Sequence, residues 1–180
     1  MRILVSGGAG SGKSALAEAC AAGLGEERLY VATMRPFGEE GAARVARHRQ
    51  RREGLRFDTL ECYTGLDSLR PEKRYDVILL ECLGNLTANE MFDASSAPKE
   101  RTVRRVLAGV AQLSRLGAHL VVVTNEVFAG AEHYDGGTAD YLAALGEIGR
   151  RLAGDFEVAV RAVCGLPLVL KGEALWESVW

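Results

Sequence analysis

The stretch Gly7-Gly8-Ala9-Gly10-Ser11-Gly12-Lys13-Ser14 decides the fold of this chain. It matches G-x-x-x-x-G-K-[ST], the loop that cradles the phosphates of a nucleoside triphosphate. The apolar residues 3–5 before it predict a short buried strand, and the Ala- and Leu-rich residues 14–24 after it predict a helix. A strand, a glycine-rich turn and a helix start form an anion site, because backbone N–H groups and the helix dipole both favour negative charge there.

The motif assigns chemical roles to its last two residues. We expect Lys13 to reach the β- and γ-phosphates and the hydroxyl of Ser14 to ligate Mg²⁺. The alternative is a glycine-rich turn that follows a strand by chance. The agreement of four fixed positions with both flanking elements disfavours that alternative. The motif therefore indicates a nucleoside triphosphate with Mg²⁺, but it does not name the reaction.

Length and composition limit the classes of protein to which the chain can belong. Its 180 residues predict one domain, spanning 1–180, that can bury a sizeable core. The net charge is −2 and no apolar run is long enough for a bilayer, so we expect neither nucleic acid nor a membrane as a partner. The chain begins directly with a predicted strand, so we expect no signal peptide and a cytoplasmic location.

The spacing of the cysteines also favours the cytosol. There are four of them, far apart in the sequence and without a C-x-x-C pair: Cys20, Cys62, Cys82 and Cys164. This spacing disfavours metal binding and disulfides, and we expect small buried thiols in a reducing cytosol.

Strand-like and helix-like segments alternate along the chain. The predicted strands are residues 3–5, 29–33, 57–62, 76–80, 120–124, 157–163 and 166–170, and the predicted helices are residues 14–24, 39–52, 83–92, 99–116 and 138–152. The continuous apolar runs at 77–80 and 120–123 are typical of strands covered on both faces, and hence of a mostly parallel sheet. We therefore predict an α/β fold, a three-layer P-loop (RecA-like) domain with a mostly parallel sheet.

The predicted helix 39–52 is basic and carries one histidine. Its positive residues and histidine are Arg44, Arg47, His48, Arg49, Arg51 and Arg52, with Arg56 just beyond. One interpretation is a solvated basic face, which is what most charge runs are. The other is a second phosphate clamp around a nucleophile. A neutral imidazole can attack phosphorus, and the arginines would lower the pKa of His48 and stabilise the transferred group.

An acidic residue follows a strongly apolar strand. Glu81 comes directly after residues 77–80, the place where P-loop folds put a second Mg²⁺-holding carboxylate. The alternative is an ordinary acidic residue at the start of a loop. Because the glycine-rich loop is present, we favour the metal role for Glu81.

Polar residues also follow the strand predicted at 120–124. Thr124-Asn125-Glu126 falls on the crevice side of the sheet, where these side chains could position a substrate or sense the γ-phosphate, although Asn125 could simply turn the chain. The next residues, 128–137, are either a substrate lid or a surface loop and include His133, Tyr134 and Asp135. We expect His119, placed before the strand, to be structural.

These segments, in their order along the chain, resemble the bifunctional adenosylcobinamide kinase / adenosylcobinamide-phosphate guanylyltransferase family of cobalamin assembly. The resemblance covers nearly the whole chain. Many families share the glycine-rich loop, so the specificity lies in the ordered combination of the other motifs. The matching segments are Gly7 to Ser14, Tyr30-Val31-Ala32-Thr33, Ala42-Ala43-Arg44 leading to His48, Thr59-Leu60-Glu61-Cys62, Leu79-Leu80-Glu81-Cys82 and Val123-Thr124-Asn125-Glu126-Val127.

The resemblance implies two reactions. A nucleoside triphosphate, ATP or GTP, gives its γ-phosphoryl group to the hydroxyl of the aminopropanol arm of adenosylcobinamide. GTP then guanylylates a histidine, pyrophosphate leaves, and the GMP passes to adenosylcobinamide phosphate to give adenosylcobinamide-GDP. The family also implies Mg²⁺, a corrinoid as the small-molecule partner, and an assembly that is often a homotrimer.

The resemblance implies site residues, position by position. The guanylylated histidine maps onto His48, and Lys13 is the second catalytic residue. The metal ligands map onto Ser14 and Glu81. The nucleotide contacts map onto Gly7, Gly8, Ala9, Gly10, Ser11, Gly12, Lys13, Ser14, Thr33, Met34, Arg35, Arg49, Arg51, Arg52, Glu61 and Glu81.

Departures from the family pattern gather in the last third of the chain. Phe128 stands where many members have glycine, Gly149-Arg150 replaces Asn-Gln, and Thr138-Ala139-Asp140-Tyr141 opens a helix that usually begins with an arginine and aspartate pair. Nearer the N-terminus, Arg47 stands where some members have a second histidine. Two other functions stay open on the residues alone: a small-molecule kinase without guanylyl transfer, and a nucleotide-dependent binding module. A covalent GMP adduct would separate the bifunctional enzyme from both.

Overall fold

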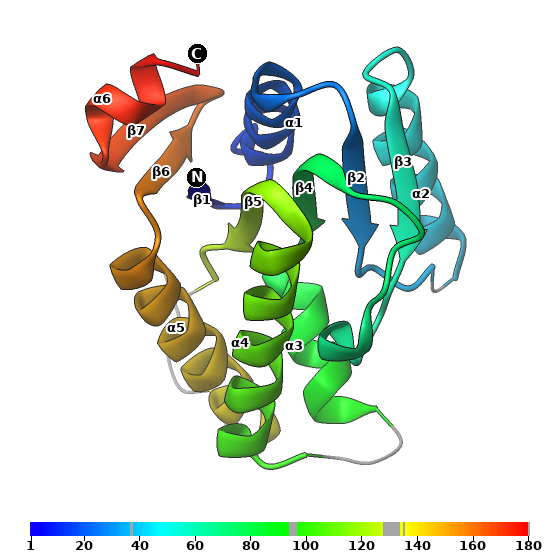
Figure 1. Cartoon of the computed structure of the whole chain (residues 1–180). Helices are drawn as coiled ribbons and strands as arrows, with labels where there is room; N and C mark the ends of the chain where they lie inside the picture. Colours follow the sequence, from blue (N-terminus) through cyan, green and yellow to red (C-terminus); the bar gives the residue numbers. More distant parts are fainter. Residues whose placement is uncertain (37, 94–96, 128–133, 135, 180) are drawn as a thin grey trace.

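A parallel sheet forms the centre of the molecule (Figure 1). The computed structural model describes residues 1–36, 38–93, 97–127, 134 and 136–179. Within them the strands are β1 (Arg2–Gly7), β2 (Arg28–Ala32), β3 (Phe57–Glu61), β4 (Tyr75–Glu81), β5 (Gly117–Asn125), β6 (Val158–Val163) and β7 (Leu166–Lys171). Their order in the sheet is β3-β2-β4-β5-β1-β6-β7, and each neighbouring pair is parallel except β6 and β7. The mostly parallel α/β fold is thus confirmed.

The register of the strands brings their carboxyl ends to one edge of the sheet. Gly7 at the end of β1 pairs with Asn125 at the end of β5. Ala32 at the end of β2 pairs with both Glu81 of β4 and Glu61 of β3. In open α/β sheets ligands bind outside this edge. The polar residues singled out in the sequence therefore lie along the edge where a nucleotide would bind.

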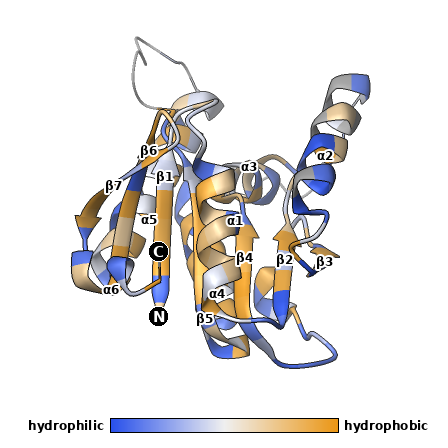
Figure 2. Ribbon diagram, turned by 90° about the horizontal axis from the view of Figure 1, so that it is seen from above, coloured by the Kyte–Doolittle hydropathy of each residue, from blue (hydrophilic) through white to orange (hydrophobic). Residues whose placement is uncertain are grey.

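Helices cover both faces of the sheet. Those in the described residues are α1 (Lys13–Leu24), α2 (Gly38–Arg52), α3 (Leu83–Phe92), α4 (Lys99–Leu116), α5 (Gly137–Asp155) and α6 (Glu173–Glu177), with a short 3-10 turn, η1 (Leu66–Ser68). Figure 2 shows α2 beside the edge formed by β2 and β3, with its polar residues in blue, while the central strands are largely orange. The helix α2 therefore stands beside the sheet and is not embedded in its two cores.

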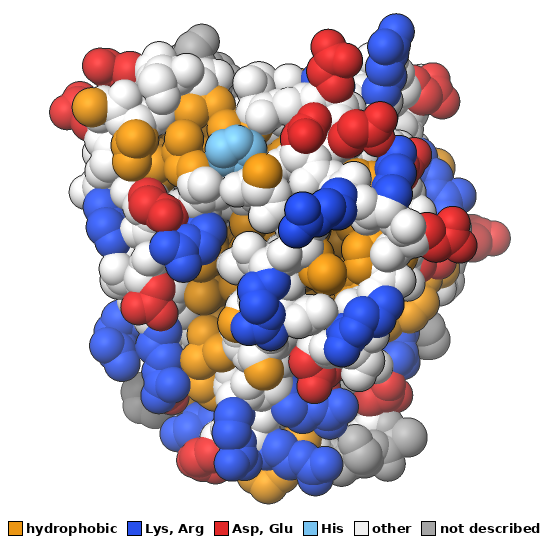
Figure 3. All heavy atoms as spheres, viewed as in Figure 1, with side chains coloured by type: hydrophobic (Ala, Val, Ile, Leu, Met, Phe, Trp, Pro, Cys, Tyr) orange, Lys and Arg blue, Asp and Glu red, His pale blue; other side chains and the backbone are white. Residues whose placement is uncertain are grey.

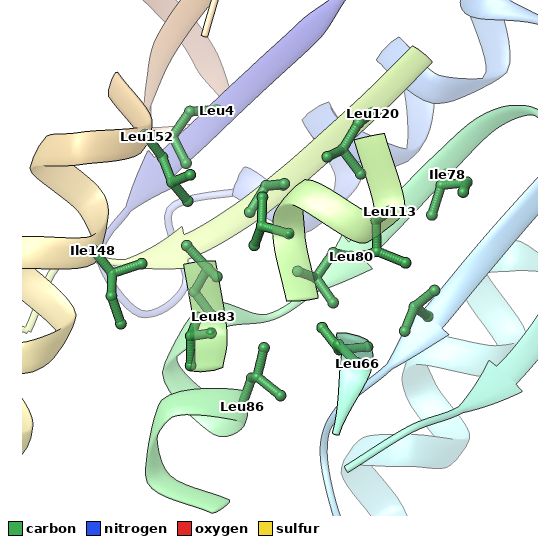
Figure 4. Packing of buried hydrophobic residues seen from close by; sticks show 14 of the residues in the cluster. Leu4, Leu66, Ile78, Leu80, Leu83, Leu86, Leu113, Leu120, Ile148 and Leu152 are labelled. Atoms are coloured by element: carbon green, nitrogen blue, oxygen red, sulfur yellow. The ribbon is translucent and has the colours of Figure 1, made fainter. Parts of the chain in front are cut away.

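Alternate residues of the central strands point into two separate cores. Leu4, Ile78 and Leu120 pack on one face, against residues of α3, α4 and α5 such as Leu113 and Ile148 (Figure 4). The residues between them, including Ile3, Val77 and Val121, pack on the other face against α1 and against Trp176 of α6. Because both faces of β1, β4 and β5 are covered, these strands read as continuous apolar runs. This is the three-layer arrangement that the sequence predicts.

Several details differ from the sequence predictions. The strand β5 begins at Gly117, so His119 lies within it, with its Nδ1 atom 3.2 Å from the N-terminal nitrogen. Burial and then the positive N-terminus lower the pKa of His119. Glu157 lies just before β6. The elements η1 and α6 were not expected from the sequence, because three and five residues are too few to show a hydrophobic period.

The prediction of buried thiols is only partly right. Cys20 and Cys82 are buried, and burial raises the pKa of Cys20 to about 12. Cys62 is half-buried, and the prediction is wrong for Cys164, which is exposed in the turn between β6 and β7. None of the described helices has the length and apolar character needed to cross a membrane.

The face shown in Figure 3 mixes charges of both signs. Over its described surface, Lys and Arg side chains are interspersed with acidic and hydrophobic ones. That part of the surface therefore carries no broad patch of one sign. The polar side chains that the sequence singles out lie elsewhere, at the carboxyl edge of the sheet.

Candidate nucleotide and phosphoryl-transfer site

The glycine-rich loop has the backbone geometry that its motif predicts. Gly10 and Gly12 have φ angles of +70° and +87°, which L-residues with a Cβ rarely adopt. Gly12 caps α1, and its carbonyl accepts the first helical bond from the N–H of Leu16, at 3.0 Å. At Gly7 a Cβ would lie 2.4 Å from the Oγ atom of Ser11. The glycines therefore allow the tight turn that leads from β1 into α1.

The turn between β6 and β7 packs directly against this loop. The N–H of Gly165 donates a hydrogen bond to the carbonyl of Ser11, at 2.9 Å. A Cβ at Gly12 would lie 2.8 Å from the Cα atom of Gly165. No side chain fits between them, so the turn fixes the loop from outside.

Lys13 and Ser14 hold the first turn of α1 in place. The Nζ atom of Lys13 donates to the carbonyl of Gly8 at 3.0 Å, so the lysine folds back over the loop. The hydroxyl of Ser14 donates to Oε1 of Glu81, a carboxylate that is buried at the end of β4. These two predicted metal ligands, distant in sequence, are thus in direct contact.

Tyr30 contacts the other oxygen of the same carboxylate. Its hydroxyl donates to Oε2 of Glu81 at 3.1 Å. Burial, and then the charge of Glu81, raise the pKa of Tyr30 well above its usual range. Tyr30 therefore stays a neutral donor at physiological pH and helps to hold Glu81 in one orientation.

His48 lies over the same carboxylate, although it comes from α2 on the far side of the site. Its Nδ1 atom is 3.6 Å from Oε1 of Glu81, and its side chain is 21% exposed. One nitrogen of His48, one oxygen of Glu81 and one oxygen of Glu18 all lie within 4.8 Å of one another. The histidine that the sequence singled out thus does not project into bulk solvent, and it lies close to Glu18 of α1.

Two cavities meet at His48. One, of about 580 Å³, is lined by the loop from Gly10 to Ser14 and by Arg47, His48 and Gln50 of α2. The other, of about 650 Å³, lies beside it and shares four lining residues with the first, Lys13, Ser14, His48 and Gln50. Its remaining wall combines apolar and polar side chains: Tyr30, Ala32, Met34, Pro36, Val45, Ala46, Arg49, Arg52, Glu53, Thr59, Glu61, Glu81, Cys82, Asn85 and Asn125. The first cavity suits phosphates, and the second is large enough for a nucleoside.

The basic helix α2 contributes side chains of two kinds. Arg49 lines the larger cavity and pairs with Glu61 at 2.8 Å, and both side chains are exposed. Arg52 is only 7% exposed, with its guanidinium 3.4 Å from the centre of the Tyr30 ring. Two of its nitrogens, Nε and Nη1, have no hydrogen-bond partner among the described residues. The side chain of Arg51 lies outside the part of the chain that the structure describes.

The residues after β2 have different positions. Met34 lines the larger cavity. Thr33 is fully buried, and its hydroxyl donates to the Cys82 carbonyl at 2.9 Å and accepts from the Cys82 N–H at 2.8 Å. Arg35 pairs with Asp93 at 2.6 Å on the surface. Thr33 thus joins the ends of β2 and β4, and Arg35 stands outside the cavity wall.

The residues at the end of β5 also have different positions. Asn125 lines the larger cavity. Glu126 accepts hydrogen bonds from Ser6 and Arg161, each at 2.9 Å, and so ties together the ends of β1, β5 and β6. Phe128, His133 and Asp135 lie outside the described residues.

Two site residues were missed in the sequence reading. Glu18 is 3% exposed and Tyr30 is 4% exposed, and both lie around Glu81. A signal for Glu18 was present, since it is the one acidic residue of α1 and comes one turn after Ser14. Tyr30 gave no comparable signal, because an aromatic residue in a strand is usually a core residue.

Comparisons with known proteins identify the family to which the chain belongs. Residues 3–170 match the family model described as "Cobinamide kinase / cobinamide phosphate guanyltransferase". The "Bifunctional adenosylcobalamin biosynthesis protein CobU" of Salmonella typhimurium (strain LT2) is 32% identical over 186 residues, covering 95% of this chain and all of the relative. The "Bifunctional adenosylcobalamin biosynthesis protein CobP" of Pseudomonas aeruginosa (strain PAO1) is 34% identical over 179 residues, covering 97% of this chain and all of the relative. The CobU protein of Escherichia coli (strain K12) is 31% identical over 183 residues, covering 95% of this chain and all of the relative.

The family match spans the loop, α2 and all the strands that form the carboxyl edge of the sheet. It includes every residue that lines the two cavities. The chain therefore belongs to the cobinamide kinase / cobinamide phosphate guanyltransferase family.

Proposed function

We propose that one site, built around the P-loop, carries out both reactions of the family, with His48 as the residue that receives GMP. The observation that carries the proposal is the position of His48. Its Nδ1 atom is 3.6 Å from Glu81, the carboxylate that accepts a hydrogen bond from Ser14 of the loop. The histidine also borders both cavities. A triphosphate in the loop would therefore lie beside a nucleophile.

In the kinase reaction the acceptor is a hydroxyl of the corrinoid substrate, and ATP or GTP is the donor. The loop amides and Lys13 would hold the β- and γ-phosphates in line with the acceptor. As the γ-phosphoryl group moves, negative charge spreads over its oxygens, and the ammonium of Lys13 stabilises it. Asn85 and Asn125 line the larger cavity, which Lys13 also lines, and they are placed to bind the acceptor.

Ser14 and Glu81 fit a magnesium ion by their chemistry. A hydroxyl and a carboxylate are oxygen ligands, which Mg²⁺ prefers, and the two side chains are in direct contact. Bound there, Mg²⁺ would neutralise charge on the phosphates. Tyr30 would keep the carboxylate of Glu81 directed at the loop through its hydrogen bond to Oε2.

In the guanylyl reaction His48 attacks the α-phosphorus of GTP. The ring nitrogen forms the new N–P bond, and the electron pair of the broken P–O bond leaves with pyrophosphate. The GMP then passes to the phosphorylated corrinoid. The covalent intermediate divides one difficult displacement into two easier ones. Arg47 lines the smaller cavity together with His48, and it would stabilise charge on the departing pyrophosphate.

The nucleotide contacts implied by the family are part of the proposal. Met34, Arg49, Arg52 and Glu61 line the larger cavity and are placed to contact the nucleoside. Thr33 would act through Cys82, which lines the same cavity. Arg35 and Arg51 remain predicted contacts of the nucleotide, as do the loop residues Gly7, Gly8 and Ala9.

A homotrimer and a cytoplasmic location also belong to the proposal. Support for self-association comes from β7, which is at the edge of the sheet. Its alternate residues Leu166, Leu168 and Leu170 are 70%, 50% and 63% exposed. An apolar row on an edge strand is typical of an interaction surface. Sedimentation of the protein with Leu168→Asp, beside the wild type, tests whether these leucines hold an assembly together.

The experiment for the site is a covalent labelling assay. Protein incubated with α-labelled GTP and Mg²⁺ should gain a GMP-sized increase in intact mass and an acid-labile label. His48→Ala should lose both. His119→Ala is the matched control, since His119 lies in β5 and contacts the N-terminus, away from the loop. Full labelling of His48→Ala would reject His48 as the nucleophile.

A further inference from the structure

Glu18 is a buried carboxylate that the two reactions, as described, do not use. It lies on α1, one turn after Ser14, and is 3% exposed. Burying a carboxylate is unfavourable unless it is paired, so a glutamate in this position needs a reason. Its surroundings supply one, because a carboxylate oxygen of Glu18 lies within 4.8 Å of a ring nitrogen of His48 and of an oxygen of Glu81.

The two carboxylates near the imidazole have different neighbours. Both oxygens of Glu81 already accept hydrogen bonds, Oε1 from Ser14 and Oε2 from Tyr30. Glu81 is also the expected partner of the metal ion. Glu18 sits on the same helix face as Ser14 and reaches the imidazole from the α1 side. Glu81 thus accepts hydrogen bonds from Ser14 and Tyr30, whereas Glu18 approaches the imidazole from a different element.

We propose that Glu18 is a positioning residue for guanylyl transfer. It accepts a hydrogen bond from one ring N–H of His48, so that the other ring nitrogen is unprotonated and directed at the triphosphate. The proposal rests on the proposed role of His48 as the nucleophile. A carboxylate that fixes the tautomer and orientation of a histidine is a known device in catalysis and in metal binding.

The same contact stabilises the covalent intermediate. When the free ring nitrogen forms its bond to the α-phosphorus, the electron pair of the breaking P–O bond leaves with pyrophosphate. The proton on the other nitrogen stays, so the ring becomes a cation beside the negative carboxylate. In the second step an oxygen of the phosphorylated corrinoid attacks, the N–P bond breaks, and its electron pair returns to the ring, which is neutral again.

This role has a signature that a merely structural residue would not give. The imidazole takes part in guanylyl transfer but not in the kinase reaction. Loss of the Glu18 carboxylate should therefore reduce the first reaction far more than the second. It should also lower the maximal rate of labelling and leave the GTP concentration for half-maximal labelling within about threefold, because the contact orients a nucleophile and does not bind GTP.

The test compares Glu18→Gln and Glu18→Asp with the wild type in both reactions. Labelling with α-labelled GTP is followed in a single turnover, and phosphorylation of adenosylcobinamide is followed with γ-labelled ATP. The ratio of labelling to phosphorylation should fall by roughly 10- to 100-fold in Glu18→Gln, as for other groups that orient a reactive histidine. Glu18→Asp, which keeps the charge, should recover part of the loss. Glu90→Gln is the matched control, because Glu90 is another buried helical glutamate, on α3.

The outcomes separate this inference from the proposed function. If His48→Ala still carries the label, the nucleophile itself is misassigned. If His48→Ala loses the label but Glu18→Gln keeps the wild-type ratio, only the role of Glu18 is overturned. Equal losses in both reactions would also overturn it, since Glu18 would then act on the loop or the metal ion. If Glu18→Gln does not fold, Glu18→Asp decides, and an unchanged ratio in that variant rejects the proposal.

Discussion

The hydroxyl of Ser14 donates a hydrogen bond to Oε1 of Glu81, 67 residues further along the chain. Ser14 lies in the first turn of α1, and Glu81 ends β4, which is separated from the loop strand β1 by β5. The hydrogen bond thus joins the helix that follows β1 to β4, a strand that is not next to β1 in the sheet. In the proposed function the kinase reaction needs this contact, because the loop and the carboxylate would face the same phosphates.

Ser14→Ala removes the hydroxyl from this contact. We expect kcat/KM to fall about 100-fold in both reactions, which corresponds to about 2.7 kcal/mol of transition-state stabilisation. The Mg²⁺ concentration for half-maximal rate should rise as well. Initial rates measured over a series of Mg²⁺ concentrations check both points. The control is Ser114→Ala, whose hydroxyl donates to the Val110 carbonyl within α4. Wild-type rates in Ser14→Ala would contradict the metal role.

Lys13→Ala tests the phosphate clamp. The ammonium lies over the loop, bonded to the Gly8 carbonyl at 3.0 Å, from where it can reach the β- and γ-phosphates. We expect the variant to lose triphosphate binding and both activities. Binding of a fluorescent GTP analogue and the two rate assays measure this. Lys99→Ala, at the start of α4, serves as the control. Turnover at the wild-type level in Lys13→Ala would show that the loop does not act on the nucleotide.

Gly12→Ala tests the contact between the loop and the β6–β7 turn. Gly12 has a φ angle of +87°, and its new Cβ would lie 2.8 Å from the Cα atom of Gly165. Strain at such a position is about 1–3 kcal/mol, before any shift of the loop is counted. We expect a lower unfolding midpoint and a large loss of nucleotide binding.

The same substitution elsewhere should do the opposite. Gly149 lies inside α5, and a Cβ there would meet nothing within 4 Å. Gly149→Ala should therefore stabilise the protein by about 0.5–1 kcal/mol, because alanine favours a helix interior. If both variants behave alike in thermal unfolding, backbone geometry at Gly12 is not what matters.

The pair formed by Arg2 and Glu157 makes stability depend on acidic pH. Arg2 donates to both carboxylate oxygens, and this hydrogen bonding is the main reason why the pKa of Glu157 falls from its usual 4.5 to about 2. The folded state therefore gains stability above pH 4.5, and that gain is lost as the pH falls from about 4.5 to about 2. Both side chains are more than a third exposed, so we expect a gain of at most about 1 kcal/mol.

Glu157→Gln checks this pH dependence. Urea unfolding at several pH values should show a difference in stability from the wild type near pH 6 that shrinks to nothing near pH 2. Arg2→Gln should lose the same stability, and the double variant should lose little more. A constant difference across the whole pH range would rule out the ion pair as its source.

The parts of the fold that the sequence predicts well are those with a single strong physical cause. Residues 77–80 and 120–123 are buried on both faces, so their composition alone marks them as central strands. The loop is marked by its glycines, and the meeting of Ser14 with Glu81 follows from the shared carboxyl edge of a parallel sheet.

Other parts could not be predicted because they depend on what packs against them. Arg52 belongs to a basic run, which favours solvent, yet it is buried against the ring of Tyr30. Glu18 reads as the polar face of a helix, yet it is 3% exposed and lies close to His48 of α2 and Glu81 of β4, both distant in sequence. Burial of a charged residue arises from tertiary packing, and a local pattern of residue types does not reveal it.

The turn that touches the loop has a consequence for how this protein can vary. Gly165 immediately precedes β7, so the first exposed leucine of that strand, Leu166, is covalently adjacent to the residue that supports Ser11. Leu166 is thus one peptide unit away from the phosphate-binding loop, with no helix between them. We therefore expect substitutions at this edge of β7 to alter nucleotide binding as well as self-association.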